Sequence, residues 1–243
     1  MEPLLVALDR VTKRFASGTL ALDGVDLALQ PGEFLSLLGP SGCGKSTILR
    51  IIAGLARPSA GSIVRPDGLE IGFVFQEPTL MPWARVIDNV RLPLDLKRAS
   101  GAEAQAQAAL ELVGLGGFAR AFPRELSGGM KMRVSIARAL VTRPSLLLMD
   151  EPFAALDEIT RLRLDDELLA LWRSQGTTIV FVTHSVFESV YLSSRIAVVA
   201  KRPGRIAETI AVEGPVPRGG FRLSPEYNAQ CAAVSAALDR ASA

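Results

Sequence analysis

One glycine-rich stretch of the chain has the residue types and spacing of a phosphate-binding loop. Residues 39–46 read Gly-Pro-Ser-Gly-Cys-Gly-Lys-Ser and fill every fixed position of the pattern G-x-x-x-x-G-K-[ST]. The glycines let the backbone curl so that successive N–H groups point inward, and the positive end of a following helix favours an anion. A plain Gly/Ser-rich turn is the alternative, which the apolar strand pattern before the loop and the helical pattern after it disfavour. We therefore expect nucleotide binding.

The side chains of this loop have separate predicted tasks. Lys45 supplies a mobile positive charge for the β- and γ-phosphates. Ser46 offers a hydroxyl ligand to a phosphate-bound Mg²⁺, and Thr47 can donate to the α-phosphate side. The expected nucleotide-binding residues of the loop are Gly39, Pro40, Ser41, Gly42, Cys43, Gly44, Lys45, Ser46 and Thr47.

Two adjacent carboxylates end a buried strand pattern further along the chain. Residues 146–149 form a continuous apolar run, which Asp150 and Glu151 follow. Burying carboxylates without a partner is expensive, and Mg²⁺ is a suitable partner. Asp150 can hold the ion directly or through water, while Glu151 can orient and polarise the attacking water. Solvated acids at a strand end are the alternative, which the phosphate loop upstream disfavours.

Two more polar side chains follow β-rich runs. Gln76 ends the run Ile-Gly-Phe-Val-Phe, and His184, the single histidine of the chain, follows Thr-Ile-Val-Phe-Val-Thr. A lone histidine is more often a structural residue than a catalytic one. However, the carboxyl ends of core strands line the ligand crevice of an α/β sheet. We therefore expect Gln76, Asp150, Glu151 and His184 to converge on one phosphate.

The surrounding patterns predict an α/β fold. Leu- and Val-rich stretches at 4–15 and 19–30 predict antiparallel strands, and the Gly- and Pro-rich stretch 57–72 predicts one or two compact hairpins. Buried strands are expected at 33–38, 71–75, 146–149 and 177–183, with flanking strands at 195–201 and 205–212. Helices are expected at 45–55, 102–113, 130–141, 157–174 and 225–243, and one after the loop that begins at 79.

This order of elements predicts a single domain with three parts. Residues 1–86 and 144–212 form a nucleotide-binding core with a β subdomain, 87–143 an inserted helical subdomain, and 213–243 a tail. In the helix at 157–174 the predicted core face consists of Ile159, Leu162, Leu168, Leu169 and Trp172.

Composition narrows the functional classes. The net charge is +2, from 27 basic and 25 acidic residues without a long basic block, so nucleic acid is not an expected partner. No apolar run approaches the roughly 18 residues of a membrane span, and we expect no export signal at the N-terminus. Two cysteines, Cys43 and Cys231, are too few for a disulfide framework and fit a reducing cytosol.

The order of these motifs resembles the ATP-binding subunits of ABC transporters over nearly the whole chain. The loop at 39–47 resembles the Walker A motif, and Leu146 to Glu151 resembles the Walker B strand with its catalytic glutamate. Further matches are Gln76 with the Q-loop, Leu-Ser-Gly-Gly-Met at 126–130 with the ABC signature, Ala155-Leu156-Asp157 with the D-loop, and His184 with the switch histidine.

The resemblance implies a P-loop NTPase (RecA-like) core that hydrolyses ATP with Mg²⁺. Its implied catalytic residues are Glu151, His184, Gln76 and Lys45, and its implied metal ligands are Ser46, Gln76 and Asp150. Phe15 falls where the family stacks an aromatic ring on adenine, although a hairpin-core phenylalanine is the alternative.

The resemblance also implies partners. In the family, the signature of one subunit, here Ser127, Gly128 and Gly129, covers the γ-phosphate held by a second copy in a head-to-tail dimer. A pair of membrane permease subunits would dock on the loop Leu80-Met81-Pro82-Trp83, for which an inward-packed core loop is the alternative. A periplasmic or lipid-anchored solute-binding protein would act indirectly, and the subunit would lie at the cytoplasmic face of the inner (plasma) membrane.

Two sequence segments point to one group within the family, and three residues depart from the usual family pattern. FQEPTLMPWARVIDNV at 75–90 and KRPGRI at 201–206 resemble the nitrate, sulfonate and taurine importers, with thiamine-precursor importers as relatives. Met132 replaces a frequent Gln, Ser185 a frequent Asp, and Ala154 a usual Gly or Ser.

A soluble ABC ATPase without a transport role is the main rival, but such proteins usually carry tandem cassettes, a long coiled coil or zinc-binding cysteines. A structural protein without turnover would leave Glu151 and His184 unexplained.

Overall fold

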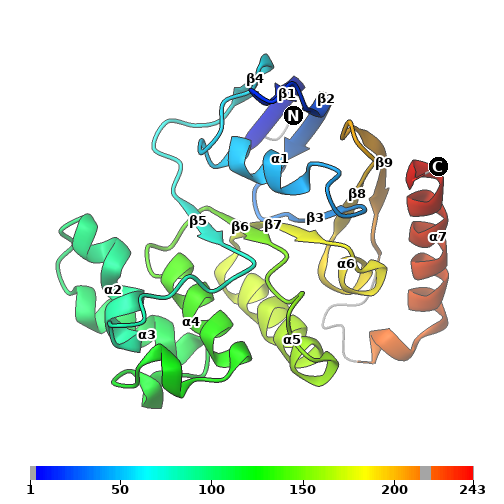
Figure 1. The fold of residues 1–243 in the computed structure, drawn as a ribbon. Coiled ribbons are helices and arrows are strands. Elements are labelled where there is room, and N and C mark those ends of the chain that lie inside the picture. Colours follow the sequence, from blue (N-terminus) through cyan, green and yellow to red (C-terminus); the bar gives the residue numbers. More distant parts are fainter. Residues whose placement is uncertain (1–3, 214–219, 243) are drawn as a thin grey trace. The chain divides into compact units, whose positions relative to one another are not determined.

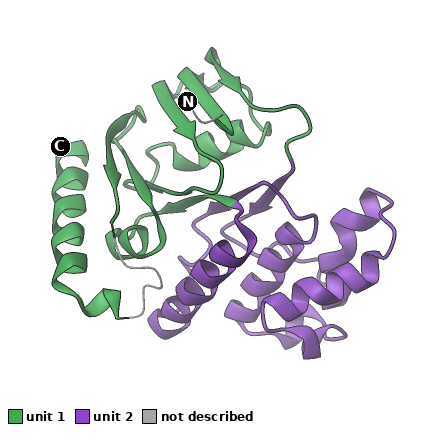
Figure 2. Cartoon of the chain, turned by 180° about the vertical axis from the view of Figure 1, so that it is seen from behind, with its two compact units in different colours: residues 1–69, 178–243 green, residues 70–177 purple. Residues whose placement is uncertain are grey.

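The computed structural model describes residues 4–213 and 220–242, which fall into two compact units (Figure 2). The first unit comprises residues 1–69 and 178–243, and the second residues 70–177. Residues 1–3 of the predicted core and residues 214–219 and 243 of the predicted tail lie outside the described residues. Among the residues that are described, no helix is both long and apolar enough to cross a membrane.

The first unit contains a three-stranded antiparallel sheet in the order β2-β1-β4. Strands β1 (Val6–Arg14) and β2 (Leu20–Leu29) form the predicted antiparallel pair. Their connection turns at Gly18, whose φ of 85° is in the left-handed region that glycine adopts without strain. One face of β1 is buried through Val6, Leu8 and Val11.

The predicted hairpin at 57–72 is wrong. This stretch contains one full strand, β4 (Ala60–Val64), which pairs with the open edge of β1 instead of folding back on itself. Gly61 explains the close approach, because a Cβ there would lie 2.3 Å from the backbone oxygen of Arg10. Only glycine lets the two backbones meet at this point.

The second sheet segment of the first unit has the order β7-β3-β8-β9. Strand β3 (Phe34–Leu38) runs parallel to β7 (Thr178–Thr183) and β8 (Arg195–Val199), and β9 (Ile206–Ala211) is antiparallel to β8. Every residue of β3 and β7 is buried, as expected of parallel strands covered on both faces. These core strands were predicted correctly from their continuous apolar runs.

Helices cover this sheet segment. Helix α1 (Lys45–Ile52) ends before the predicted Leu55, because Gly54 takes a left-handed φ of 76°. Helix α6 (Val186–Leu192) packs on β3 and β7, and the tail helix α7 (Pro225–Ser242), preceded by η3 (Phe221–Leu223), packs on α6, β8 and β9 (Figure 1).

The second unit contains two parallel strands and most of the helices. Strand β5 (Ile71–Val74) pairs with β6 (Leu146–Asp150). Helices α2 (Val86–Leu96), α3 (Ala102–Leu112) and α4 (Gly128–Leu140) contact one another, and α4 also contacts β5. The predicted linker at 115–123 holds two short turns, η1 (Gly116–Phe118) and η2 (Pro123–Glu125). The subdomain boundaries at 87 and 143 stay a prediction.

The predicted core face of α5 (Glu158–Gln175) is only partly correct. Leu168 and Leu169 are buried, but Ile159 is 82% exposed and Leu162 is exposed as well. The buried stripe instead runs through Leu164, Leu168 and Leu171, at spacings of four and three residues. Ile159 and Leu162 lie off this stripe, and Trp172 is half-buried. Gly176 ends the helix as predicted, with a φ of 63°.

Candidate nucleotide-binding and coupling sites

The predicted phosphate loop joins β3 to α1 in the first unit. Gly42 and Gly44 have left-handed φ values of 76° and 104°. At Gly44, the N-cap of α1, a Cβ would lie 2.6 Å from Cδ2 of Leu22, so a side chain has no space. Without a capping side chain at this position, the first-turn N–H groups of α1 are suited to an anion.

The charge of Lys45 lies against this loop. Its Nζ donates to the carbonyl oxygens of Gly39 at 2.7 Å and Pro40 at 3.0 Å, and only 3% of the residue is exposed. A buried ammonium group requires such polar partners. The positive charge is therefore held at the place where the sequence predicts phosphate binding.

His184 lies at the same sheet edge as the start of the phosphate loop. Strands β3 and β7 are parallel, and Leu38 is paired with Thr183, so Gly39 and His184 both directly follow paired residues. His184 is exposed. Ser185, which stands where Asp is frequent in the family, still caps α6, because its Oγ accepts a hydrogen bond from the N–H of Glu188 at 3.2 Å.

In the second unit, Gln76 and the two carboxylates likewise follow paired strand ends. Val74 of β5 is paired with Met149 of β6, and the strands are parallel. Asp150 is buried at the end of β6, and Gln76 is exposed. Glu151 has a left-handed φ of 48°, an unfavourable conformation for a residue with a side chain, of the kind that clusters at functional sites.

The residues predicted to hold Mg²⁺ have suitable chemistry. Within residues 4–213 and 220–242, no group of three or more His, Cys, Asp or Glu side chains could hold a metal ion by itself. Mg²⁺ commonly uses one or two protein ligands together with phosphate oxygens and water. Ser46 in the first unit offers a hydroxyl oxygen, and Gln76 and Asp150 in the second unit offer amide and carboxylate oxygens, all of which are ligand types that suit Mg²⁺.

The signature and the D-loop meet at one residue that the sequence analysis missed, Thr160. Ser127 caps α4, because its Oγ accepts from the N–H of Met130 at 3.3 Å. A Cβ at Gly129 would lie 2.8 Å from Cγ2 of Thr160. Oδ1 of Asp157 accepts from the N–H of Thr160 at 2.9 Å, and this hydrogen bond lowers the pKa of Asp157. No motif covers Thr160, so only the fold reveals this contact.

Phe15 follows β1 and is 44% exposed. The alternative of a buried hairpin-core phenylalanine is therefore wrong. Nζ of Lys13 lies 5.5 Å from the centroid of the Phe15 ring. Stacking on adenine stays a prediction for this ring.

The loop before α2 presents Trp83 to solvent. Trp83 is 77% exposed, so the inward-packed alternative is wrong for this residue. The buried amide of Asn89 fixes the loop: its Oδ1 accepts from the N–H of Met81 at 2.7 Å, and its Nδ2 donates to the backbone oxygens of Met81, Ala84 and Arg85 at 3.1–3.2 Å. The sequence analysis did not single out Asn89.

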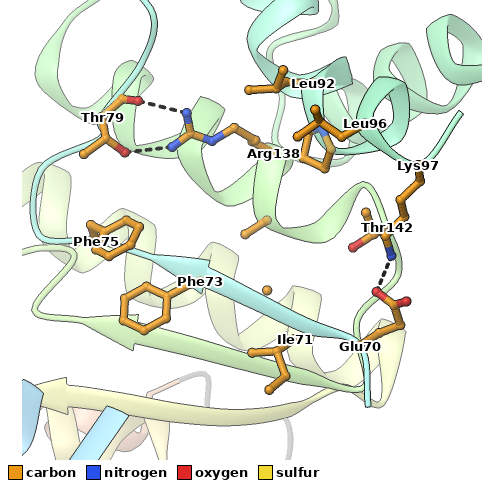
Figure 3. Close-up of a pocket in the computed structure, with 13 residues that line it drawn as sticks. Glu70, Ile71, Phe73, Phe75, Thr79, Leu92, Leu96, Lys97, Arg138 and Thr142 are labelled. Atoms are coloured by element: carbon orange, nitrogen blue, oxygen red, sulfur yellow. Dashed lines mark hydrogen bonds and ion pairs between the residues drawn. The ribbon is translucent and has the colours of Figure 1, made fainter. Parts of the chain in front are cut away.

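A pocket of about 410 Å³ lies in the second unit, lined in part by β5, Thr79 and α2 (Figure 3). Its lining is mostly apolar and includes Ile71, Phe73, Phe75, Leu92 and Leu96. At its edge the guanidinium group of Arg138 donates to the backbone oxygens of Pro78 and Thr79 and to Oγ1 of Thr79, each at 2.9 Å. Burial lowers the pKa of Arg138. The pocket is thus an apolar surface whose edge is hydrogen-bonded to Pro78 and Thr79, which follow Gln76.

Comparison with known proteins decides the family. The profile described as "ABC transporter" matches residues 22–154, more than half of the chain. The chain belongs to the ABC transporter family. This ABC ATPase is 49% identical, over 86% of both chains, to the protein named "Aliphatic sulfonates import ATP-binding protein SsuB 1" of Pseudomonas syringae pv. syringae (strain B728a). It is 45% identical to SsuB of Bacillus subtilis (strain 168), over 86% of this chain and 83% of that protein.

The similarity extends to solved structures. The ATP-binding cassette MJ0796, in a dimeric post-hydrolysis state bound to ADP and Pi, superimposes with a TM-score of 0.75 at 35% identity, over 86% of this chain and all of that chain. The fold is therefore the α/β P-loop NTPase fold of the ABC cassettes, and the chain is an ATP-binding, ATP-hydrolysing subunit. Both predictions made from the motifs are confirmed, and the similarities do not favour the rival of a soluble ABC ATPase without a transport role.

Proposed function

We propose that this ABC ATPase powers the import of a small organic sulfonate or a related anion. The observation that carries the proposal is its 45–49% identity to two proteins named as aliphatic sulfonates import ATP-binding proteins, over 86% of this chain. The phrases at 75–90 and 201–206 resemble the same importer group, which also includes nitrate and taurine importers. The solute itself would contact the permease and a solute-binding protein.

The roles of the nucleotide-site residues follow from their chemistry. Phe15 would stack on adenine and the loop at 39–47 would cradle the phosphates, with Lys45 neutralising the β- and γ-phosphates. A Mg²⁺ ion held by Ser46, Gln76 and Asp150 would supply further charge neutralisation when bound. The strained backbone at Glu151 supports a functional role for this carboxylate.

Hydrolysis requires a water molecule oriented toward the γ-phosphate. We assign that task to the carboxylate of Glu151, which would polarise the water as a general base. Gln76 and His184 would contact the water or the γ-phosphate and sense whether it is present. Each of them follows a core strand in its own unit, which fixes its backbone position.

A second copy of the chain would complete the site. Ser127 and Gly128 are exposed at the N-terminus of α4, where backbone N–H groups suit an anion. We assign Ser127, Gly128 and Gly129 to the γ-phosphate held by the other copy, with Asp157 of the D-loop at the same interface. The dimeric state of MJ0796 supports this proposal.

Membrane permease subunits would dock at the exposed loop with Trp83 and at the apolar pocket of the same unit. Apolar pockets with exposed aromatic side chains are typical of protein interaction sites. This docking would hold the ATPase at the cytoplasmic face of the membrane, where ATP is available.

Growth on a sulfonate tests the proposed function. In the cells that produce this protein, deletion of the chain should abolish growth with a short-chain alkanesulfonate as the sole sulfur source, while growth on sulfate stays normal. The wild-type chain should restore growth, and Lys45→Ala should not. Normal growth of the deletion strain on several alkanesulfonates and on taurine, with normal uptake of both, would refute a role in sulfonate import.

A further inference from the structure

One segment beside the phosphate loop has no role in the proposed function, although its sequence helped to define the resemblance. It comprises residues 199–204, from the end of β8 to the turn before β9, and we call it the buttress segment. It belongs to the same unit as the phosphate loop.

The buttress segment touches the phosphate loop at three successive places. A Cβ at Gly39 would lie 2.6 Å from the backbone oxygen of Val199, and a Cβ at Gly204 would lie 2.1 Å from the backbone oxygen of Cys43. Between these two contacts, Nε and Nη2 of Arg202 donate to the backbone oxygen of Gly42 at 3.3 and 3.1 Å. The buttress segment and the phosphate loop therefore run in close backbone contact, and the side chain of Arg202 joins them.

The buttress segment is held in place independently of Arg202. The N–H of Gly204 donates to the backbone oxygen of Ala21 at 2.9 Å, and the N–H of Asp23 donates to the backbone oxygen of Gly204 at 3.0 Å. The N–H of Lys201 donates to the backbone oxygen of Ala241 in α7 at 3.2 Å. Replacing the exposed Arg202 side chain should therefore leave this backbone anchored.

We propose that Arg202 is a positioning residue that fixes the Gly42–Cys43 peptide of the phosphate loop for nucleotide binding. This proposal rests on the proposed phosphate-binding role of residues 39–47. Gly42 has a left-handed φ of 76° and no side chain, so its backbone has more conformational freedom than that of a residue with a side chain. The two hydrogen bonds from Arg202 restrain its carbonyl group.

Two physical effects link this contact to affinity. Fixing a loop in its binding conformation before the ligand arrives reduces the entropy lost on binding. A charged donor on a carbonyl oxygen also polarises the peptide, which makes the N–H of the same peptide, on Cys43, a stronger donor. In this structure that N–H donates to the backbone oxygen of Pro40 at the long distance of 3.3 Å, and a bound phosphate would compete for it. Arg202 itself contacts no reacting group, so its loss should raise the Kd and the KM for ATP and leave kcat nearly unchanged.

The test is calorimetric titration of the purified full chain with ATP and with ADP. Arg202→Ala should weaken binding of both nucleotides by about threefold to tenfold, because an exposed charge-assisted hydrogen bond contributes modestly. Arg202→Lys should recover only part of the loss, since lysine keeps the charge but lacks the two-pronged guanidinium group. Steady-state hydrolysis by Arg202→Ala should show the rise in KM with kcat within about twofold of wild type.

Arg205→Ala is the matched control, because it removes the same charge three residues away. The guanidinium group of Arg205 pairs instead with the carboxylate of Asp23. Its nucleotide affinity should equal that of wild type. Equal weakening in Arg205→Ala, full recovery in Arg202→Lys, or a lowered kcat with unchanged KM in Arg202→Ala would each overturn the role of Arg202.

Lys45→Ala separates this proposal from the assignment of the phosphate loop. If the wild type binds ATP, Lys45→Ala does not, and Arg202→Ala binds like wild type, then only the role of Arg202 fails. If Lys45→Ala binds ATP like wild type, the assigned role of the loop fails and the positioning role fails with it.

Discussion

Gly129 of the signature packs against Thr160 in the first turn of α5 so closely that a Cβ would lie 2.8 Å from Cγ2 of Thr160. The same threonine donates its N–H to Asp157 of the D-loop. Thr160 thus joins two segments that we assign to the interface between two copies of the chain.

A double-mutant cycle tests this contact. Alanine favours a helix over glycine by about 1 kcal/mol, but at position 129 its methyl group should collide with Thr160. Gly129→Ala should therefore be destabilising or neutral in the wild type. It should be more favourable by about 1 kcal/mol in a Thr160→Ser background, which removes the colliding methyl group. Urea unfolding of the four proteins gives the coupling, and additive effects would contradict the contact.

The cap at Asp157 should make stability depend on pH. The hydrogen bond from Thr160 lowers the pKa of Asp157 in the folded state. Its stabilising contribution is therefore fully present above the unfolded pKa of about 3.9 and is lost as the pH falls through the folded pKa. The difference in Tm between wild type and Asp157→Asn should be constant from pH 7 to about pH 5 and change below about pH 4. A constant difference down to the pH of acid unfolding would contradict this cap.

Asn89 should be important for stability although no motif includes it. Asn89→Ala removes a side chain that bonds four backbone groups in the loop before α2. We expect a loss of about 2 to 3 kcal/mol in the free energy of unfolding, because partly buried backbone groups of this loop would lose their hydrogen bonds to the side chain. Chemical denaturation measures this loss. A change below about 0.5 kcal/mol, which is typical of surface substitutions, would show that the loop does not depend on Asn89.

Trp83 should affect assembly and not folding. Because the residue is 77% exposed, Trp83→Ala should change the free energy of unfolding by less than about 0.5 kcal/mol. If Trp83 anchors the permease, its truncation should cost more than about 2 kcal/mol of binding, roughly thirtyfold in affinity. A pull-down with the permease measures this effect, and Leu223→Ala, at 89% exposure, is the matched control. Normal permease binding by Trp83→Ala would remove this residue from the docking surface.

Local patterns were sufficient to predict the core strands and the phosphate loop. Apolar runs predicted β3 and β7, and the spacing of Gly39, Gly44 and Lys45 predicted the loop between β3 and α1. Parallel pairing then explains why Gly39 and His184 leave the same sheet edge.

Contacts between distant segments could not be predicted in this way. The stretch at 57–72 carries turn residues typical of a hairpin, but β4 forms its backbone hydrogen bonds by pairing with β1. Ile159 is apolar yet exposed, because tertiary packing selects a different stripe of α5. The contacts of Thr160, Asn89 and Arg202 join residues whose types are common at any surface, so the sequence offers no pattern that marks them.

Glutamine at position 151 is the substitution that tests the catalytic assignment. Glu151→Gln keeps the size of the side chain and most of its hydrogen bonding, but it removes the carboxylate that would polarise water. ATP should therefore still bind, and the closed dimer should persist because hydrolysis no longer opens it. Lys45→Ala should differ by failing to bind ATP productively, since the loop loses its mobile positive charge.

The most direct measurement is ATP-driven uptake of a labelled alkanesulfonate by proteoliposomes that contain this ATPase, its permease and the solute-binding protein. The wild type should accumulate the sulfonate only when ATP is present on the side of the ATPase. Glu151→Gln should bind ATP with wild-type affinity and show less than about 1% of the wild-type uptake and hydrolysis, a loss of two or more orders of magnitude that is typical of removing a general base. Rapid sulfonate uptake and ATP turnover by Glu151→Gln would contradict the role of Glu151 as general base. Hydrolysis by the wild type without any sulfonate uptake would contradict the proposed import of sulfonates.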